Sequence, residues 1–212
     1  MPGHAVQERV ELADTLRSTE PAAPTLCGGW SVAQLAAHLV LRERSVVELL
    51  GRVPSGRAHA VAQRAIDAYV ARTPYPRLIA AVAAGAPRWS PLALPPLREA
   101  VNLLEYLVHH EDVRRAAEGW VPRVLPVPRQ DAVWSRLRVA SRLTLRLMPV
   151  PVRLEWPDHG SISVGSGRPG VTVTGAPEEL VLVAFGRQSV ARVDYAGPDD
   201  AVARVQGADI AV

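Results

Sequence analysis

The sequence predicts an α+β protein, in which a helical N-terminal part is followed by a smaller part that contains a sheet. Three observations support this class. Apolar residues recur at helical spacing up to Trp120, a proline-rich segment follows, and short β-like stretches separated by turn residues come next. We therefore expect one domain over residues 1–120 and a second over residues 121–212.

Four amphipathic segments are expected to form the helices of the first domain. Apolar residues recur in them every three or four positions, as Val6, Val10 and Ala13 do in the first segment. The segments are residues 4–18, 31–50, 59–84 and 97–118. The third contains "TPYP", so it forms either one helix broken at this point or two short helices over 59–72 and 75–84. Four such helices joined by loops predict a helical bundle.

The second helix has a clear start signal. Ser31 and Gln34 have the spacing of a capping box, in which each side chain binds the other residue's backbone N–H. Trp30 precedes the box as a candidate hydrophobic staple, and Gly51 is expected to end the helix.

The second domain combines helices with short strands. "VPRVLPVP" reads as a linker and "DAVWSRLRVASRLTLRLM" as a helix. The expected strands are "VPVRLEW", "GSISVG", "GVTVTG", "ARVDYAG" and "AVARVQG". Between the third and fourth lies "APEELVLVAFGR", which predicts a helix because Pro177 and two acids stand in its first turn and Gly186 at its end.

Composition excludes several classes of protein. The apolar runs are far shorter than the roughly 20 residues needed to cross a bilayer, and the N-terminal segment has no apolar signal-peptide core. All 24 basic residues are Arg, and they alternate with acids as on solvated helix faces. We therefore expect a cytoplasmic protein that binds neither membranes nor nucleic acid. The single Cys27 excludes an internal disulfide.

Two segments carry a candidate metal site. Glu105 and His109 are one helical turn apart in "NLLEYLVHHEDVRR" and can point at the same ion. His38 lies between Leu35 and Leu39 on the expected inner face of the second helix. Two histidines and one glutamate suit Zn²⁺ or another first-row divalent ion and leave a coordination position open.

Structural explanations compete with this site. His38 could be a core histidine with satisfied hydrogen bonds, and Glu105 with His109 a pair on the helix surface. His110 is expected on the face turned away from the apolar residues of its helix. Asp112 either orients a ligating imidazole or pairs with Arg115 on the surface.

Cys27 in "TLCGGW" also has two interpretations. It is either a nucleophile or ligand near the mouth of the bundle, or a small apolar residue that packs under a glycine turn. Gly28 and Gly29 are turn formers, because no strand precedes them as in a phosphate-binding loop.

Three motifs in order along the chain resemble the mycothiol-dependent maleylpyruvate isomerase family. They are "PTLCGGWSVAQLAAHLVLRER", "NLLEYLVHHEDVRRA" with "GWVPR", and "VTVTGAPEELVLVAFGR". The sequence is most similar to the shorter branch of the family, which is described only as metal-binding proteins. The resemblance implies a DinB-like four-helix bundle and a C-terminal α+β domain similar to sterol-carrier folds. It also implies a metal, usually zinc, at the positions of His38, Glu105 and His109.

The resemblance further implies an enzyme that uses a low-molecular-weight thiol, mycothiol, as cosubstrate. The metal is expected to bind the thiol sulfur and lower its pKa, and the thiolate then adds to a small electrophilic substrate, as in an isomerase or an S-transferase. Arg187 matches an arginine of the C-terminal domain and would bind a substrate carboxylate, or it only complements a helix dipole. Arg42, on the face near His38, is a second candidate for stabilising negative charge.

A non-catalytic metal-binding or small-ligand sensor is the alternative, and a purely structural bundle is a third possibility. The sequence leaves the oligomeric state open.

Overall fold

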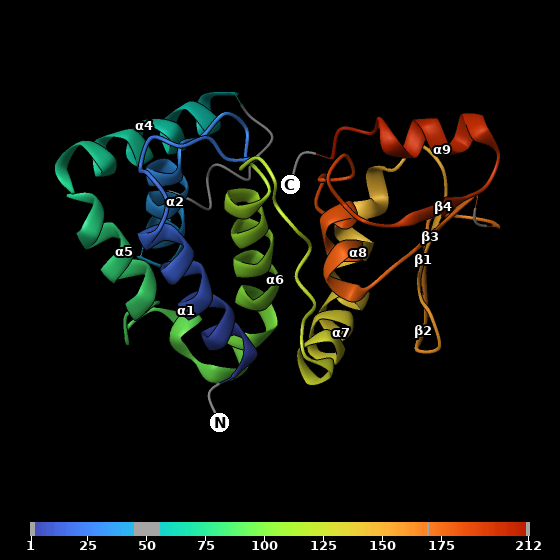
Figure 1. Ribbon diagram of the computed structural model, residues 1–212, viewed down its shortest axis with the longest axis horizontal. Helices are drawn as coiled ribbons and strands as arrows, with labels where there is room; N and C mark the ends of the chain where they lie inside the picture. The colour runs from blue at the N-terminus through green and yellow to red at the C-terminus, as the bar shows by residue number, and fades with distance from the viewer. Residues whose placement is uncertain (1–2, 45–55, 169, 211–212) are drawn as a thin grey trace. The chain divides into compact units, whose positions relative to one another are not determined.

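The computed structural model describes residues 3–44, 56–168 and 170–210, and the chain forms two compact units, Met1–Val121 and Pro122–Val212. The first unit is helical and the second contains a four-stranded mixed sheet with helices (Figure 1). The predicted α+β class, with the helices first, is therefore confirmed. In the described parts of the chain, no helix combines the length and apolarity that a membrane span requires.

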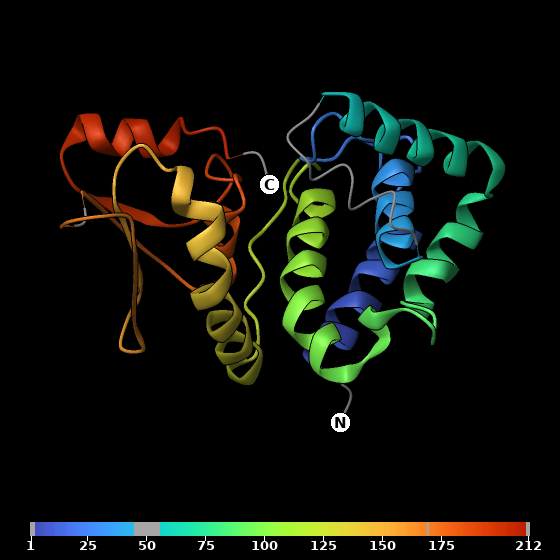
Figure 2. The same ribbon diagram turned by 180° about the vertical axis from the view of Figure 1, so that it is seen from behind.

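The first unit is a bundle of α-helices with one helix across its end. Its helices are α1 (His4–Arg17), α2 (Val32–Arg44), α4 (Gly56–Arg72), α5 (Tyr75–Ala84) and α6 (Pro95–Arg114), with a 3-10 turn η1 (Pro91–Ala93) before α6. Helix α1 packs against α5 and α6, and α2 packs against α4 and α5. Figures 1 and 2 show α4 running across the ends of the other helices. The bundle therefore consists of α1, α2, α5 and α6.

The start of α2 follows the capping box. The Ser31 N–H donates to Gln34 Oε1 at 2.9 Å, and the Gln34 N–H donates to Ser31 Oγ at 3.3 Å. The Trp30 indole lies beside the ring of His38, with the ring centroids 5.0 Å apart. The expected continuation of this helix to residue 50 and its end at Gly51 lie outside the described residues.

The third expected segment forms two helices. Helix α4 ends at Arg72 and α5 begins at Tyr75, because Pro74 has an extended backbone (φ −54°, ψ 137°) and stands at the N-cap of α5. The Tyr75 hydroxyl donates to the carbonyl oxygen of Leu16 at 2.7 Å, which fastens the start of α5 to α1. The alternative of two short helices is thus correct.

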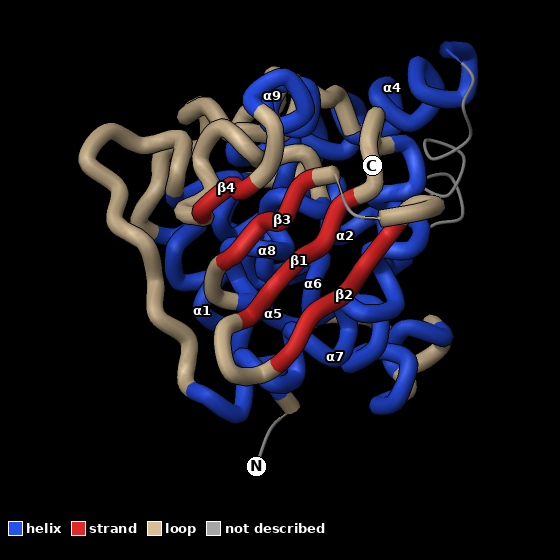
Figure 3. Tube along the Cα trace, turned by 90° about the vertical axis from the view of Figure 1, so that its right-hand side faces the viewer, coloured by secondary structure: helices blue, strands red, loops and turns tan. Residues whose placement is uncertain are grey.

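The second unit is built on a mixed sheet. It contains α7 (Val127–Thr144), η2 (Leu145–Leu147), β1 (Val152–Trp156), β2 (Gly160–Val164), β3 (Val171–Thr174), α8 (Pro177–Ala184), β4 (Asp194–Ala196) and α9 (Asp199–Gln206). The strand order is β2-β1-β3-β4 (Figure 3). Strand β1 pairs antiparallel with β2 and parallel with β3, and β3 pairs antiparallel with β4. Alternate residues of β1 and β3 are buried, so one face of the sheet packs on the core.

Helix α8 is the core helix of this unit. All of its residues are buried, and it packs against α7. Its two acids accept hydrogen bonds from backbone groups: the N–H of Leu125 donates to Glu178 Oε1 and the N–H of Arg192 donates to Glu179 Oε2, at 3.2 and 2.8 Å. These two hydrogen bonds attach the segments on either side of the helix to its first turn.

One expected strand is wrong. "AVARVQG" forms most of helix α9, which follows Pro198 and begins with Asp199 and Asp200. Two acids in the first turn favour a helix start. Ala201 and Val205 are the buried residues of this helix, one turn apart, so burial follows the helical period and not the alternation of a strand.

Candidate metal centre

His38, Glu105 and His109 converge between α2 and α6. His38 Nε2 lies 3.4 Å from Glu105 Oε1, and His109 Nε2 lies 3.5 Å from the same oxygen. The two imidazole rings meet edge to face, with centroids 5.2 Å apart and planes at 71°. Ligand atoms of all three residues lie within 4.8 Å of one another. The structure thus brings together the three residues that the sequence predicts as ligands.

The donor set fits a divalent cation of zinc type. Two ligands held about 2.0–2.1 Å from a tetrahedral zinc lie about 3.4 Å apart. The separations of 3.4 and 3.5 Å correspond to this value and are long for hydrogen bonds. The side chains are mostly buried, with exposed fractions of 13% for His38, 12% for Glu105 and 10% for His109. One side of the group therefore remains accessible for a further ligand.

Arg42 is the closest cation to the carboxylate of this group. Its Nε lies 2.9 Å from Glu105 Oε1, and its Nη1 donates to Asn102 Oδ1 at 2.7 Å. Burial raises the pKa of Glu105, but Arg42 and hydrogen bonds from His109 and His38 lower it, and the pKa ends well below its usual range. Glu105 is therefore an ionised candidate ligand, oriented by a guanidinium that Asn102 holds in place.

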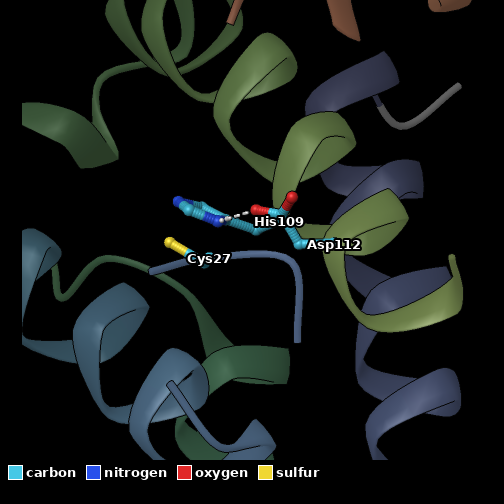
Figure 4. Close-up of side chains that lie close together, drawn as sticks. All are labelled: Cys27, His109 and Asp112. Atoms are coloured by element: carbon cyan, nitrogen blue, oxygen red, sulfur yellow. Dashed lines mark hydrogen bonds and ion pairs between the residues drawn. The ribbon is translucent and has the colours of Figure 1, made fainter. Parts of the chain in front are cut away.

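Asp112 orients the other side of the His109 ring. Its Oδ2 lies 3.0 Å from His109 Nδ1, as the dashed line in Figure 4 marks. Burial lowers the pKa of His109, but Asp112, Cys27 and Glu105 raise it, and the pKa lies well above its usual value. Asp112 is completely buried, so the alternative of a surface pair with Arg115 is wrong. A carboxylate on Nδ1 leaves Nε2 for a metal, which is the usual support of a ligating histidine.

His110 faces the opposite helix and belongs to a separate cluster. Its Nδ1 lies 2.7 Å from Glu8 Oε1 and its Nε2 lies 2.8 Å from Thr15 Oγ1, both on α1. The sequence predicts position 110 on the face turned away from the apolar residues of its helix; α1 covers this face, and His110 is 2% exposed. Ligand atoms of Glu8, Glu11 and His110 also lie within 4.8 Å of one another, but the contacts with Glu8 and Thr15 use both ring nitrogens of His110.

Trp30 forms one wall beside the candidate ligands. Its ring lies against His38, and its indole N–H donates to Gln63 Oε1 of α4 at 2.8 Å. Gln34 of α2 and Gln63 both donate to Asp67 Oδ1 of α4, at 2.8 and 2.9 Å. The packing of α4 on α2 thus fixes the indole that covers the imidazole.

Arg187 stands in the second unit, just after α8. Its Nη1 donates to the carbonyl oxygen of Phe185, and the side chain is half-buried. This local bond is compatible with a helix C-terminal cation, and a role toward a substrate stays a prediction. Glu155 and His159, which have the same spacing as Glu105 and His109, lie in and after β1 and form no comparable site.

Sequence reasoning left the position of Cys27 open. The structure places its side chain beside His109 and Asp112, with ligand atoms of the three within 4.8 Å of one another. Its motif "TLCGGW" was the available signal, but the contact depends on how the loop folds back onto α6, which spacing along the chain does not reveal.

Residues 3–141 match the family described as the mycothiol maleylpyruvate isomerase N-terminal domain. The chain belongs to this family. A search of curated proteins found no match.

Two crystal structures share the fold of nearly the whole chain. The mycothiol-dependent maleylpyruvate isomerase is 18% identical, with a TM-score of 0.54, and a histidine-to-alanine mutant of it is 17% identical, with a TM-score of 0.55. Each match covers 92% of this chain and 96% of the other. The likeness in fold therefore extends through both units, whereas the family match ends at residue 141 and the identity is too low to transfer an activity.

Proposed function

We propose that this member of the family is a metal-dependent enzyme that uses a low-molecular-weight thiol, in the manner of a mycothiol-dependent isomerase or S-transferase. The observation that carries the proposal is the convergence of His38, Glu105 and His109: Glu105 Oε1 lies about one edge of a zinc tetrahedron from each imidazole Nε2, and ligand atoms of all three lie within 4.8 Å of one another. The chain also shares its family and its fold with a protein described as mycothiol-dependent. The substrate is a small electrophile.

His38, Glu105 and His109 would hold the cation through two imidazole nitrogens and one carboxylate. When bound there, a divalent cation supplies Lewis acidity, which lowers the pKa of a thiol or of water. Glu105 is kept ionised by Arg42, so it needs to lose no proton on binding. Asp112 fixes the plane of the His109 ring, and Trp30 shields His38 from solvent on one side.

The charges of the centre favour an anionic ligand. A divalent cation and Arg42 together exceed the charges of Glu105 and Asp112 by one, and all four lie in a mostly buried region. A thiolate brings the sum of these charges to zero, whereas a neutral ligand leaves a buried positive charge uncompensated. Arg42 would act on the thiolate through this balance of charge, because its Nε and Nη1 are turned to Glu105 and Asn102. We assign to Arg187 the binding of a substrate carboxylate.

Metal analysis of the purified protein tests the centre. We expect close to one zinc or related ion per chain in the parent and loss of the ion in His38→Ala, because two ligands rarely retain a divalent cation. His159→Ala is the matched control, since this histidine is exposed and stacks on Trp156 in the second unit. Equal and substoichiometric metal in the parent and in His38→Ala would show that these residues hold no ion.

Thiol addition to the cobalt-substituted protein tests the use of a thiol. We expect mycothiol to change the visible spectrum, because its sulfur enters the coordination shell of the cobalt and alters the ligand field. A spectrum that mycothiol leaves unchanged, in a protein that binds cobalt, would favour the non-catalytic metal-binding or sensor function instead.

A further inference from the structure

The loop that carries Cys27 is fastened to α6 next to the candidate metal centre. The backbone N–H of Leu26 donates to the carbonyl oxygen of Asp112 at 3.1 Å. This bond joins the residue before Cys27 to the residue that orients His109. Cys27 is therefore placed beside the centre by a defined backbone contact between distant parts of the chain.

The conformation of the loop is also fixed from within. The Trp30 N–H donates to the carbonyl oxygen of Cys27 at 2.9 Å, and the N–H of Cys27 donates to Thr25 Oγ1 at 3.2 Å. Gly28 and Gly29 have φ angles of 53° and 80°, and a Cβ on either would meet no atom within 4 Å. The glycines are thus required for the left-handed backbone and not for packing. They turn the chain so that Trp30 and Cys27 both face the histidines.

The side chain of Cys27 has polar neighbours that can bind a cation. Its sulfur points toward the ring of His109 (Figure 4), and ligand atoms of Cys27, His109 and Asp112 lie within 4.8 Å of one another. The side chain of Cys27 is half-buried, whereas His109 and Asp112 are buried. A cysteine that serves only as a small apolar residue would lie among aliphatic side chains, not against an imidazole and a carboxylate.

We propose that Cys27 is a sulfur ligand of the cation that His109 holds, so that this centre contains a thiolate from the protein itself. Sulfur favours Zn²⁺, Co²⁺ and Cd²⁺ over Mg²⁺ and Ca²⁺, and it would give the site a preference for soft divalent ions. On binding, the S–H bond breaks, a sulfur–metal bond forms, and the proton passes to solvent. The proposal rests on the metal centre proposed above and adds a ligand that the two-histidine, one-glutamate set does not contain.

A protein sulfur on the ion has a consequence for thiol use. The cosubstrate would meet a cation whose fourth position already carries sulfur, and it would have to displace Cys27 or expand the coordination shell. Cys27 would thus hold the ion in a closed state until a thiol competes for the position.

Cobalt absorption in a buffer without thiols tests the proposal. We expect the cobalt-loaded parent to show the intense near-ultraviolet band of a sulfur–cobalt bond together with weaker visible bands. Cys27→Ser should lose the near-ultraviolet band and keep the visible ones. A parent that shows only the visible bands, or a Cys27→Ser variant that keeps the near-ultraviolet band, would overturn the role of Cys27 and leave the metal centre standing. A parent that binds no cobalt would overturn the centre and this proposal together.

The single cysteine allows an independent measurement. Reaction with a chromogenic disulfide reports on Cys27 alone, because the chain has no other thiol. We expect the rate to fall by about tenfold or more when the protein is loaded with zinc, since a bound thiolate is not free to attack. In His38→Ala, zinc at the same concentration should give little protection. Equal rates with and without zinc in the parent would contradict a sulfur ligand even if circular dichroism shows an intact fold.

Discussion

Arg42 Nε and Glu105 Oε1 lie 2.9 Å apart in a mostly buried region, so a guanidinium from α2 neutralises a carboxylate from α6. The same carboxylate oxygen faces both candidate histidine ligands. In the protein without metal, Arg42 is therefore the main positive charge on Glu105. A bound cation would also compensate the charge of Glu105. The stability of the contact between α2 and α6 should therefore depend on both Arg42 and the cation.

Replacing Arg42 by Met should destabilise the metal-free protein by about 3–5 kcal/mol, because it leaves a buried carboxylate without its charge partner. Zinc should raise the thermal midpoint of the variant more than that of the parent, because the cation then supplies the missing positive charge. Thermal unfolding with a chelator and with zinc measures both effects. An equal shift in variant and parent would show that Arg42 and the cation do not act on the same carboxylate.

Replacing Asp112 by Asn should weaken metal binding by about 10–100-fold, because Asp112 fixes the ring of His109 through Nδ1. Competition with a chromophoric chelator measures the affinity. Asp158→Asn serves as the control, since Asp158 is exposed in the β1–β2 turn. An Asp112→Asn variant with the affinity of the parent would mean that His109 needs no carboxylate support.

Replacing Thr15 by Val should distinguish the roles of His109 and His110, the two neighbouring histidines of α6. The hydroxyl that meets His110 Nε2 is removed, and we expect a loss of about 1–3 kcal/mol because this ring nitrogen then has no partner on Thr15. The metal content should not change, since His110 faces α1 and not the centre. Chemical denaturation and metal analysis test this pair of expectations, and a loss of metal without a loss of stability would assign His110 to the centre.

Tyr75 should titrate late in the folded protein. Burial raises its pKa from 10.0 to about 12, and Glu20 contributes in the same direction. The folded state thus holds the phenolic proton more tightly than the unfolded state. The contribution of Tyr75 to the free energy of unfolding is therefore fully present below about pH 10 and is lost as the pH rises toward 12. Ultraviolet difference titration of the parent and of Tyr75→Phe measures it, and the variant should lack the tyrosine transition near pH 12 and lose less stability over this range.

The sequence predicts the candidate metal ligands because helical spacing places each of them on an inner helix face. Glu105 and His109 are one turn apart on α6, and His38 stands between the buried Leu35 and Leu39. The capping box of α2 is equally local, since it needs only Ser31 and Gln34.

Contacts between distant segments could not be predicted in this way. The burial of His110 depends on the docking of α1, and the position of Cys27 depends on the bond from Leu26 to α6. The stretch that forms helix α9 is wrongly predicted as a strand, because short stretches of Val and Ala suit both a strand and a helix. The acids in the first turn of α9 favour the helix more strongly than the alternating apolar residues favour a strand.

Adjacent histidines on α6 give this helix two polar sides. His109 takes part in the contacts with α2, and His110 takes part in the contacts with α1. A helix held in this way cannot separate from α1 without also shifting the imidazole on its other side. In the zinc-loaded protein, release of the metal and melting of the N-terminal unit should therefore occur as one cooperative event, with loss of helical circular dichroism at the same temperature.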